Sequence, residues 1–431
     1  MLSGRLFTIW ILSLLVLPLG AGVVLAAEAP PAQTAAASGY EVWVIDQSDS
    51  SKDGGGTLYI YDGASLTADP KSAKAETVDL GDKFAEACKD VGGFPKRPHM
   101  IFFTKDGKYG ILSYVASGHV VFLDAAARAP IGCISLGKNA HAAWPTANMK
   151  MALGANIAEK KLVRIWTDYG NKKFTIKPEN DVVALSTLEP ILPDAAPICP
   201  ITDSKSQYVF VTPRGGGFAV YDLTATPMFL RGTISETAVR PAGCGGVQIG
   251  DTMYLNSGGG WPNTPLNHDV YAFSMGSLPD VSVPVRIGGR EGGDAHGMVA
   301  VGGKYLWSGD RHLNLIDVYD TGNGNIKVGT VLLAGDLTND PAPDLMDTAP
   351  DSSFVFAALR GPSPLTGNNK DVNNAVGSTP GVGVIKVESG GRGGTLIGIA
   401  AISKKVQEKD KEGKDVTVEK ADPHGIQARK K

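Results

Sequence analysis

The chain has no marked excess of charge of either sign. Its 41 lysine and arginine residues nearly balance its 44 aspartate and glutamate residues, which leaves a formal net charge of −3. A protein that attracts nucleic acid through its overall charge would be more basic, so we expect no nucleic-acid partner.

Several motifs with known chemistry are also missing. The sequence contains no Walker motif, no CxxCH haem-attachment motif and no GxSxG nucleophile elbow. The GGG runs at 54–56, 215–217 and 258–260 fall in expected hairpin loops, where glycine supplies positive φ and no phosphate cradle. Function therefore has to be inferred from residues outside these motifs.

Helical periodicity is scarce. The 54 glycines and 27 prolines favour frequent turns, which are typical of many short strands. Residues 81–93 could hold one short turn of helix, and the charge run at 402–420 favours a solvated hairpin or loop. We therefore expect an all-β protein.

The first 27 residues differ from the rest of the chain. One arginine precedes a long apolar run at 6–26, and small residues around Ala26 and Ala27 suit cleavage there. This pattern predicts a secretory signal peptide (1–27), followed by a Pro/Ala linker (28–38) and one domain (39–431). The mature protein would be periplasmic or secreted, and it would contact a membrane only if the apolar segment stayed uncleaved.

Residues 94–137 form a unit of four expected strands. Three apolar runs are separated by the turns KDGK and ASGH, and the edge strand PIGCISLG follows. This layout is typical of a four-stranded antiparallel meander. Similar units recur along the chain, at 141–168, 199–224, 244–275, 296–320 and 344–388.

A seventh unit is split between the two ends of the sequence. Residues 422–431 offer an opening strand with nothing after it, and residues 40–81 offer the following strands with no opening one. A radial array of sheets is commonly fastened by sharing its last sheet between both ends. The repeats thus predict a seven-bladed β-propeller of four-stranded antiparallel blades whose closing blade is shared by the N- and C-termini.

The first unit resembles a known repeat. Its pattern PHxIxFTxDGKY, with VVFLD one hairpin later, is similar to the YVTN-type and lactonase-like propeller repeats. The wider group includes the propellers of nitrous-oxide reductase and of haem-bearing nitrite reductases. The resemblance implies the fold much more strongly than any activity, because propellers host many functions.

The expected opening strands begin with an unusual set of side chains. In a propeller these strands are innermost and line the central channel. The residues at their starts would then form a ring at one end of the channel: His99, His141, Cys199, Cys244, His296, one of Asp344, Met346 or Asp347, and His424. The chain has only seven histidines in all, so four of them near one axis indicate a candidate metal site on His99, His141, His296 and His424.

Cationic side chains are expected on the same face. Each loop from the second to the third strand of a unit returns to the end of the channel where the first strand began. Loops on a rigid scaffold often carry function. We take the residues in these loops as candidate cofactor- or anion-binding residues: His119, Arg214, Arg311, His312 and Arg360.

Three interpretations of these residues remain open. Imidazole ligands suit copper, zinc or iron, thiolates shift the preference toward copper or zinc, and we take copper as the first candidate. Alternatively, the arginines could pair with an anionic substrate or cofactor while a histidine ligates a haem iron or acts as an acid or base. Lastly, the histidines could be structural and hydrogen-bond within their blades.

The four cysteines allow three pairings. In an oxidising compartment nearby thiols tend to form disulfides, and we favour the pairs Cys88–Cys133 and Cys199–Cys244. In the segments DAHGM and DPHGI, an aspartate precedes the histidine by two residues. It could orient the imidazole or form an Asx-turn.

These observations favour an exported propeller that binds a metal or redox cofactor on its histidine-rich face. It would be a periplasmic oxidoreductase, or its accessory protein, acting on a small anion. The alternatives are a non-catalytic module that docks on an electron-transfer protein and a lactonase-like hydrolase. The sequence leaves open whether the chain is an enzyme.

Overall fold

The computed structural model describes residues 39–48, 55–189, 191–259 and 265–431. The predicted signal peptide and linker lie outside these residues. The first unit folds as expected, with the strands β4 (Pro98–Phe103), β5 (Tyr109–Tyr114), β6 (His119–Asp124) and β7 (Ala129–Ser135). Its first turn is closed by local polar groups: Gly107 has a φ of +69°, and the Asp106 carboxylate accepts hydrogen bonds from the Lys108 amide and the Thr104 hydroxyl. Glycine is the residue that adopts this left-handed conformation without strain.

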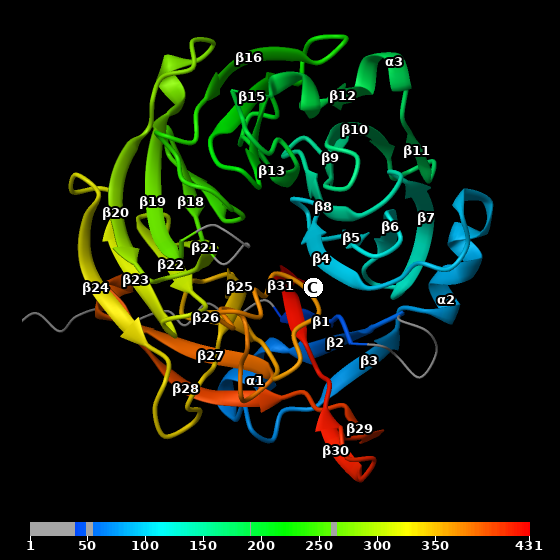
Figure 1. Ribbon diagram of the computed structural model, residues 1–431, viewed down its shortest axis with the longest axis vertical. Coiled ribbons are helices and arrows are strands. Elements are labelled where there is room, and N and C mark those ends of the chain that lie inside the picture. The colour runs from blue at the N-terminus through cyan, green and yellow to red at the C-terminus, as the bar shows by residue number, and fades with distance from the viewer. Residues whose placement is uncertain (1–38, 49–54, 190, 260–264) are drawn as a thin grey trace, which may run out of the picture. The chain divides into compact units, whose positions relative to one another are not determined.

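The unit recurs to give seven blades of antiparallel strands in a ring (Figure 1). The strands β4 to β7 form blade 1. Blade 2 consists of β8 (Ala140–Pro145), β9 (Met151–Asn156), β10 (Lys161–Asp168), β11 (Lys173–Thr175) and β12 (Val182–Ala184), the last two both pairing with β10. Blade 3 consists of β13 (Pro197–Thr202), β14 (Tyr208–Pro213), β15 (Phe218–Asp222) and β16 (Phe229–Ile234).

The next three blades follow in sequence. Blade 4 consists of β17 (Gly246–Ile249), β18 (Thr252–Ser257), β19 (Asn267–Ser274) and β20 (Val285–Glu291). Blade 5 consists of β21 (Ala295–Val301), β22 (Tyr305–Asp310), β23 (Leu315–Asp320) and β24 (Ile326–Leu332). Blade 6 consists of β25 (Pro343–Thr348), β26 (Phe354–Leu359), β27 (Gly381–Glu388) and β28 (Gly393–Ala401).

Blade 7 joins the two ends of the described chain, as the split unit predicted. The strand β31 (Pro423–Lys430) pairs antiparallel with β1 (Tyr40–Asp46), and β2 (Thr57–Asp62) and β3 (Ala75–Asp79) follow outward. As the innermost strand, β31 contacts β4 of blade 1 and β25 of blade 6. The ring is therefore closed by main-chain hydrogen bonds between segments almost 400 residues apart, about the length of the propeller itself.

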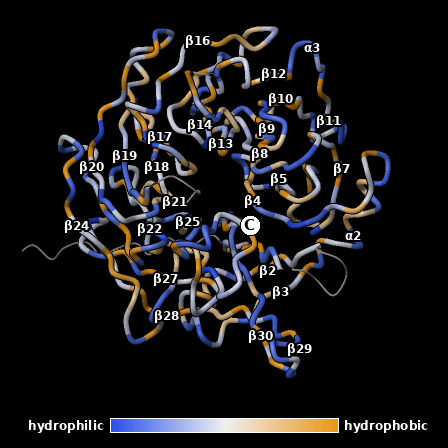
Figure 2. The backbone as a smooth tube through the Cα atoms, in the orientation of Figure 1, coloured by the Kyte–Doolittle hydropathy of each residue, from blue (hydrophilic) through white to orange (hydrophobic). Residues whose placement is uncertain are grey.

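The cores lie between neighbouring blades. In one cluster Trp43 of blade 7 packs with Leu112 and Val121 of blade 1, and in another Phe210 of blade 3 packs with Phe273 of blade 4. Hydrophobic and hydrophilic residues alternate along the chain throughout the ring (Figure 2). This alternation lets each strand present apolar side chains to an adjacent sheet.

Helices are short and lie in the connections between strands. They are α1 (Gly63–Ala68), α2 (Asp82–Ala85), α3 (Pro178–Asp181) and the 3₁₀ turns η1 (Glu86–Val91), η2 (Leu185–Leu188), η3 (Met275–Ser277) and η4 (Ser389–Gly391). The helical turn expected at 81–93 is confirmed. No helix in the described part of the chain is long and apolar enough to cross a membrane.

The charge run at 402–420 forms a separate hairpin of β29 (Lys405–Lys409) and β30 (Asp415–Glu419). It lies outside the ring in Figure 1 and is mostly exposed. The expectation of a solvated hairpin is confirmed.

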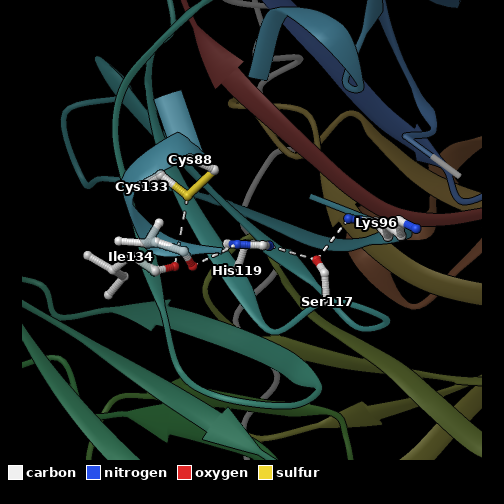
Figure 3. Close-up of a disulfide and its surroundings, with 7 residues drawn as sticks. Cys88, Lys96, Ser117, His119, Cys133 and Ile134 are labelled. Carbon is white, nitrogen blue, oxygen red and sulfur yellow. Dashed lines mark hydrogen bonds between the residues drawn. A yellow bond between two sulfur atoms is a disulfide. The ribbon is translucent and has the colours of Figure 1, made fainter. Parts of the chain in front are cut away.

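One of the two predicted disulfides is present. Cys88 of η1 is bonded to Cys133 of β7 (Figure 3), which ties the segment leading into blade 1 to its outer strand. The Cys199–Cys244 pairing is wrong, because both residues are buried free thiols.

Candidate functional site

The innermost strands of several blades share a local irregularity at their start. A β-bulge interrupts the pairing after the first residue of β4, β8, β25 and β31. In β4, β25 and β31 that first residue is a proline, which can open a strand because it has no N–H to donate. A bulge re-aims the side chain that follows, and this residue is His99 in β4, His141 in β8, Asp344 in β25 and His424 in β31.

The bulges bring the predicted histidines together. Nε2 of His99 lies 3.0 Å from Nε2 of His141. The ring centroids of His99 and His424 are 3.8 Å apart, and those of His424 and His296 are 5.7 Å apart. All four imidazoles therefore lie in one cluster, as the strand alignment predicted.

Asp344 is the side chain that blade 6 contributes to this cluster. One of its carboxylate oxygens lies 2.9 Å from Nε2 of His296, and the other lies 3.6 Å from Nε2 of His424. The potential ligand atoms of these three residues all lie within 4.8 Å of one another. Of the three candidates that the sequence offered for blade 6, the other two, Met346 and Asp347, line a different cavity.

Hydrogen bonds set which ring nitrogen of each histidine carries the proton. His99 Nδ1 lies 2.8 Å from Oε1 of Gln47, whose amide nitrogen donates to Asp422. His424 Nδ1 lies 3.0 Å from the carbonyl oxygen of His99. Because both partner oxygens can only accept, the Nδ1 atoms carry the protons and the neutral rings keep a lone pair on Nε2. These lone pairs face the centre of the cluster.

Burial favours the neutral form of these imidazoles. It lowers the pKa of His99 and His424 well below the usual value and lowers the pKa of His141 to about 3. Nε2 of His296 has no well-aligned hydrogen bond among the described residues, although a carboxylate oxygen is close. His99 and His424 thus present unprotonated Nε2 atoms at neutral pH.

Two buried arginines compensate the Asp344 carboxylate. Arg360 contacts one of its oxygens and also binds Asp422 through Nε at 2.6 Å. Arg311 lies 3.5 Å from the other oxygen. Burial alone would raise the pKa of Asp344, but the surrounding histidines and arginines hold it well below its ordinary range. The carboxylate is therefore ionised at neutral pH.

The cluster lines a cavity of about 370 Å³, which we call the histidine cavity. Besides the four histidines, the side chains of Arg97, Arg214, Ile198 and Cys244 line it. Residues 365–368, from the long loop between β26 and β27, line it as well. The Thr366 side chain bonds to Gln47, and its carbonyl oxygen accepts from Arg360. The loop is thus anchored over the site by groups that also orient His99 and Asp344.

The predicted cation and histidine candidates separate into two groups. Arg214 and Arg311 line the histidine cavity, whereas Arg360 lies behind it with no exposed surface. His119 lies away from the cavity beside the disulfide, where its ring contacts Ser117 and the carbonyl oxygen of Val91 (Figure 3). His312 is half-buried in the turn after β22 and does not line the cavity.

The alignment of Cys199 with His99 is wrong by one residue. The bulge between Pro197 and Cys199 places Ile198 at the equivalent position, where it lines the histidine cavity. Cys199 does not line this cavity and packs in a hydrophobic cluster with Phe210 of blade 3 and Phe273 of blade 4. A strand that slips by one residue presents its other face, and a bulge cannot be located from hydrophobic pattern alone.

The aspartates two residues before His296 and His424 do not orient these imidazoles, which was one of the two roles considered from the sequence. Asp294 accepts hydrogen bonds from Arg311 and Asn374, and Asp422 accepts from Arg360 and Gln47. They hold arginines and do not orient the imidazole that follows them. Gln47, Asn374 and Arg97 were not singled out from the sequence. Only Arg97 could have been found there, because it lies two residues before His99 and so near the start of an innermost strand.

A second cavity, of about 350 Å³, shares Cys244 with the first. Three buried methionines, Met100, Met298 and Met346, line it, and we call it the methionine cavity. Asp347 also lines it and accepts hydrogen bonds from the amides of Thr348 and Ala428. Burial nevertheless raises the pKa of Asp347 to about 6.

We expect Asp347→Asn to abolish a fall in stability between acid and neutral pH. A folded-state pKa above the unfolded value means that the folded state binds the proton more tightly, so wild-type stability falls as pH rises from about 4 to about 6. Asparagine carries no charge and removes this fall, but its single acceptor oxygen satisfies only one of the two amides, which costs about 1 kcal/mol at every pH. Relative to the wild type, the variant should therefore be less stable near pH 4 and should gain about 1–2 kcal/mol between pH 4 and pH 7. Urea unfolding across this range measures the effect. The control Asp351→Asn should not stabilise, because hydrogen bonds from Ser353 lower the pKa of that exposed carboxyl; equal pH profiles for both variants would contradict the prediction.

Comparisons with known proteins identify the fold and not the family. No protein-family model matches the sequence, and no curated protein is detectably similar. A putative 6-phosphogluconolactonase from Bacteroides uniformis aligns at 14% identity over 90% of this chain and 99% of its own, with a TM-score of 0.56. The periplasmic gluconolactonase of Pseudomonas aeruginosa aligns at 11% identity over the same shares, with a TM-score of 0.53.

Hydrazine synthase from Kuenenia stuttgartiensis is a third structural neighbour. It aligns at 13% identity over 67% of this chain and 76% of its own, with a TM-score of 0.51. At these identities the shared feature is the propeller fold, which hosts unrelated activities. The resemblance to YVTN-type repeats stays a prediction.

Proposed function

We propose that this propeller binds a divalent transition metal in the histidine cavity and is an exported oxidoreductase, or its accessory protein, acting on a small anion. One observation carries the proposal: two imidazoles and one carboxylate, from His296, His424 and Asp344, converge within 4.8 Å. Two histidines and a carboxylate with open positions beside them are a donor set typical of redox-active metal centres.

The spacing of the donor atoms suits a single ion. Two ligand atoms that each lie about 2.1 Å from a metal are about 3 Å apart when the angle between the bonds is near 90°. The 2.9 Å separation between His296 and Asp344 matches this value. Nε2 of His296, buried and without a hydrogen bond in the described structure, would gain a partner.

His99 can add a further ligand when its Nε2 exchanges the 3.0 Å contact with Nε2 of His141 for the ion. Its Nε2 lone pair is fixed by the Nδ1 bond to Gln47, the kind of outer hydrogen bond that orients metal-ligating histidines. A carboxylate among several imidazoles suits a mononuclear iron or copper ion better than haem, whose iron takes one or two axial protein ligands. The bound ion would exchange electrons with a molecule that occupies its open coordination positions.

The chain's own residues would hold the anion beside the ion. Arg97, Arg214 and Arg311 line the same cavity, and guanidinium groups bind oxyanions through paired hydrogen bonds. The loop residues 365–368 also line this cavity. Small oxyanions of nitrogen or sulfur fit a cavity of about 370 Å³ that is lined in this way.

Export and an electron-transfer partner complete the proposal. The Cys88–Cys133 disulfide supports an oxidising compartment, where such bonds persist. There a periplasmic electron-transfer protein would exchange electrons with the metal. Fractionation of the producing cells, with mass determination of the mature N-terminus, tests export.

The metal site is tested by loading the full-length protein with iron(II) or copper(II) and measuring bound metal. We expect one ion per chain in the histidine cavity. His296→Ala/His424→Ala should lose it, and Gln47→Ala should weaken binding about 10- to 100-fold, as the loss of an outer-shell partner usually does. The loaded wild type is then assayed for reduction of nitrite or sulfite with an artificial electron donor.

His312→Ala is the matched control, because its imidazole lies outside the cavity. It should bind metal like the wild type, and circular dichroism should show that each variant is folded. Unchanged metal content in His296→Ala/His424→Ala would exclude this site. A wild-type protein that binds neither metal would favour the non-catalytic docking module instead.

A further inference from the structure

We propose that His141, Cys199 and Cys244 form a second metal site, separate from the one above, which binds one copper(I) ion. The three residues come from blades 2, 3 and 4, and their ligand atoms all lie within 4.8 Å of one another. The two cysteines are at most 1% exposed. The site therefore lies inside the ring where three consecutive blades meet.

The state of the cysteines argues for a ligand role. The same chain closes Cys88 and Cys133 into a disulfide, whereas Cys199 and Cys244 are free thiols with their sulfur atoms close together. The imidazole of His141 lies within the same group of ligand atoms. A disulfide would not require an imidazole at this position, whereas a metal site would use it as a third ligand. Two sulfurs and one nitrogen converging on a point are the donors of a soft metal ion.

His141 has a ring nitrogen available for such an ion. Its Nε2 faces Nε2 of His99 at 3.0 Å, while its Nδ1 is buried without a well-aligned hydrogen-bond partner in the described part of the chain. A buried nitrogen of this kind loses hydrogen-bonding free energy relative to its solvated state. A bond from Nδ1 to a metal held by the neighbouring thiolates would remove that loss.

The donor set selects copper(I) over the ions proposed for the other site. Thiolates favour copper(I) and zinc, whereas carboxylates favour harder ions. Structural zinc is almost always bound by four ligands, and this group contains three among the described residues. Copper(I) accepts three ligands, so the group is complete for it.

The methionine cavity adjoins this site at Cys244. Cys244 lines both cavities, and Met100, Met298 and Met346 line the methionine cavity. Thioethers are soft ligands that bind copper(I). Copper(I) could pass from the methionines to Cys244 by exchange of sulfur ligands, with no change in oxidation state.

The test is an anaerobic titration of the reduced full-length protein with copper(I) in competition with a chromophoric copper(I) chelator. We expect one tightly bound ion, with sulfur scatterers in its X-ray absorption spectrum. Cys199→Ser/Cys244→Ser should weaken binding at least about 100-fold, more than the usual effect of an outer-shell partner. His296→Ala/His424→Ala should retain copper(I), which separates failure of this site from failure of the proposed function.

Three results would overturn the site. They are unchanged copper(I) affinity in the double cysteine variant, a copper spectrum without sulfur scatterers in the wild type, and zinc bound in preference to copper(I). The spectrum needs only wild-type protein, so the test holds even if the variants do not fold. A native Cys199–Cys244 disulfide found by peptide mass spectrometry, with no copper(I) uptake after reduction, would likewise contradict the proposal.

Discussion

Replacement of Arg360 by methionine is expected to lower the free energy of unfolding by about 3–5 kcal/mol. The guanidinium contacts Asp344 and binds Asp422 through Nε at 2.6 Å and an Nη at 3.0 Å, and all three side chains are fully buried. Methionine keeps most of the volume but leaves two carboxylates without their main cation. Removing one partner of a buried ion pair is far more harmful than replacing the whole pair.

Arg214→Met is the matched control for this prediction. Arg214 also pairs with an aspartate, Asp194, but both side chains are about 30% exposed. Exposed ion pairs contribute about 0–1 kcal/mol, so the loss should be small. Urea unfolding at pH 7 measures both variants, and equal losses would contradict the assigned role of Arg360.

The pH dependence gives an independent check on the Arg360 variant. In the wild type the pKa of Asp344 is held well below its usual range, so its contribution to stability is present at neutral pH and is lost as pH falls through the folded-state pKa. Without the arginine, burial raises the pKa of the unpaired carboxyls. The variant should therefore regain stability as the pH falls from 7 to 5, and its deficit relative to the wild type should shrink.

The position of this arginine shows what the sequence could and could not predict. The seven blades were predictable because each repeats the same alternation of apolar runs and turns, and the two incomplete units at 40–81 and 422–431 complete each other. The clustering of His99, His141, His296 and His424 followed from that alignment, since equivalent residues of innermost strands face one channel.

The polar network around the histidines was not predictable in the same way. Arg360 was expected to meet a ligand, yet it is used to neutralise Asp344 and Asp422, which lies 62 residues away in the chain. Such pairs depend on where loops cross the channel, and no local pattern encodes that. The one-residue error at Cys199 has a similar origin, because the bulge before it leaves the hydrophobic pattern unchanged.

A chain that ends at residue 421 is expected not to form the native propeller. This truncation removes β31, the innermost strand of blade 7, and with it the backbone pairing of β1 from Tyr40 to Asp46. It also deletes the Arg429 side chain, which binds the buried Glu41, and exposes the apolar residues of β1 that pack against it. An open ring with an unpaired, hydrophobic edge strand is an aggregation-prone species.

The β29–β30 hairpin provides a matched deletion of similar length. Lys404 and Lys420 flank it and are joined by a backbone hydrogen bond of 2.9 Å, so a two-residue Asn-Gly turn can replace residues 405–419. Because the hairpin is mostly exposed and pairs only with itself in the described structure, this variant should unfold cooperatively within a few degrees of the wild-type Tm. The truncated chain should show no cooperative thermal transition by circular dichroism, and a peptide of residues 421–431 added in trans should restore part of it. A truncated chain with the wild-type transition would show that β31 does not close the ring, and the convergence of His424 with the other histidines would then have no structural basis.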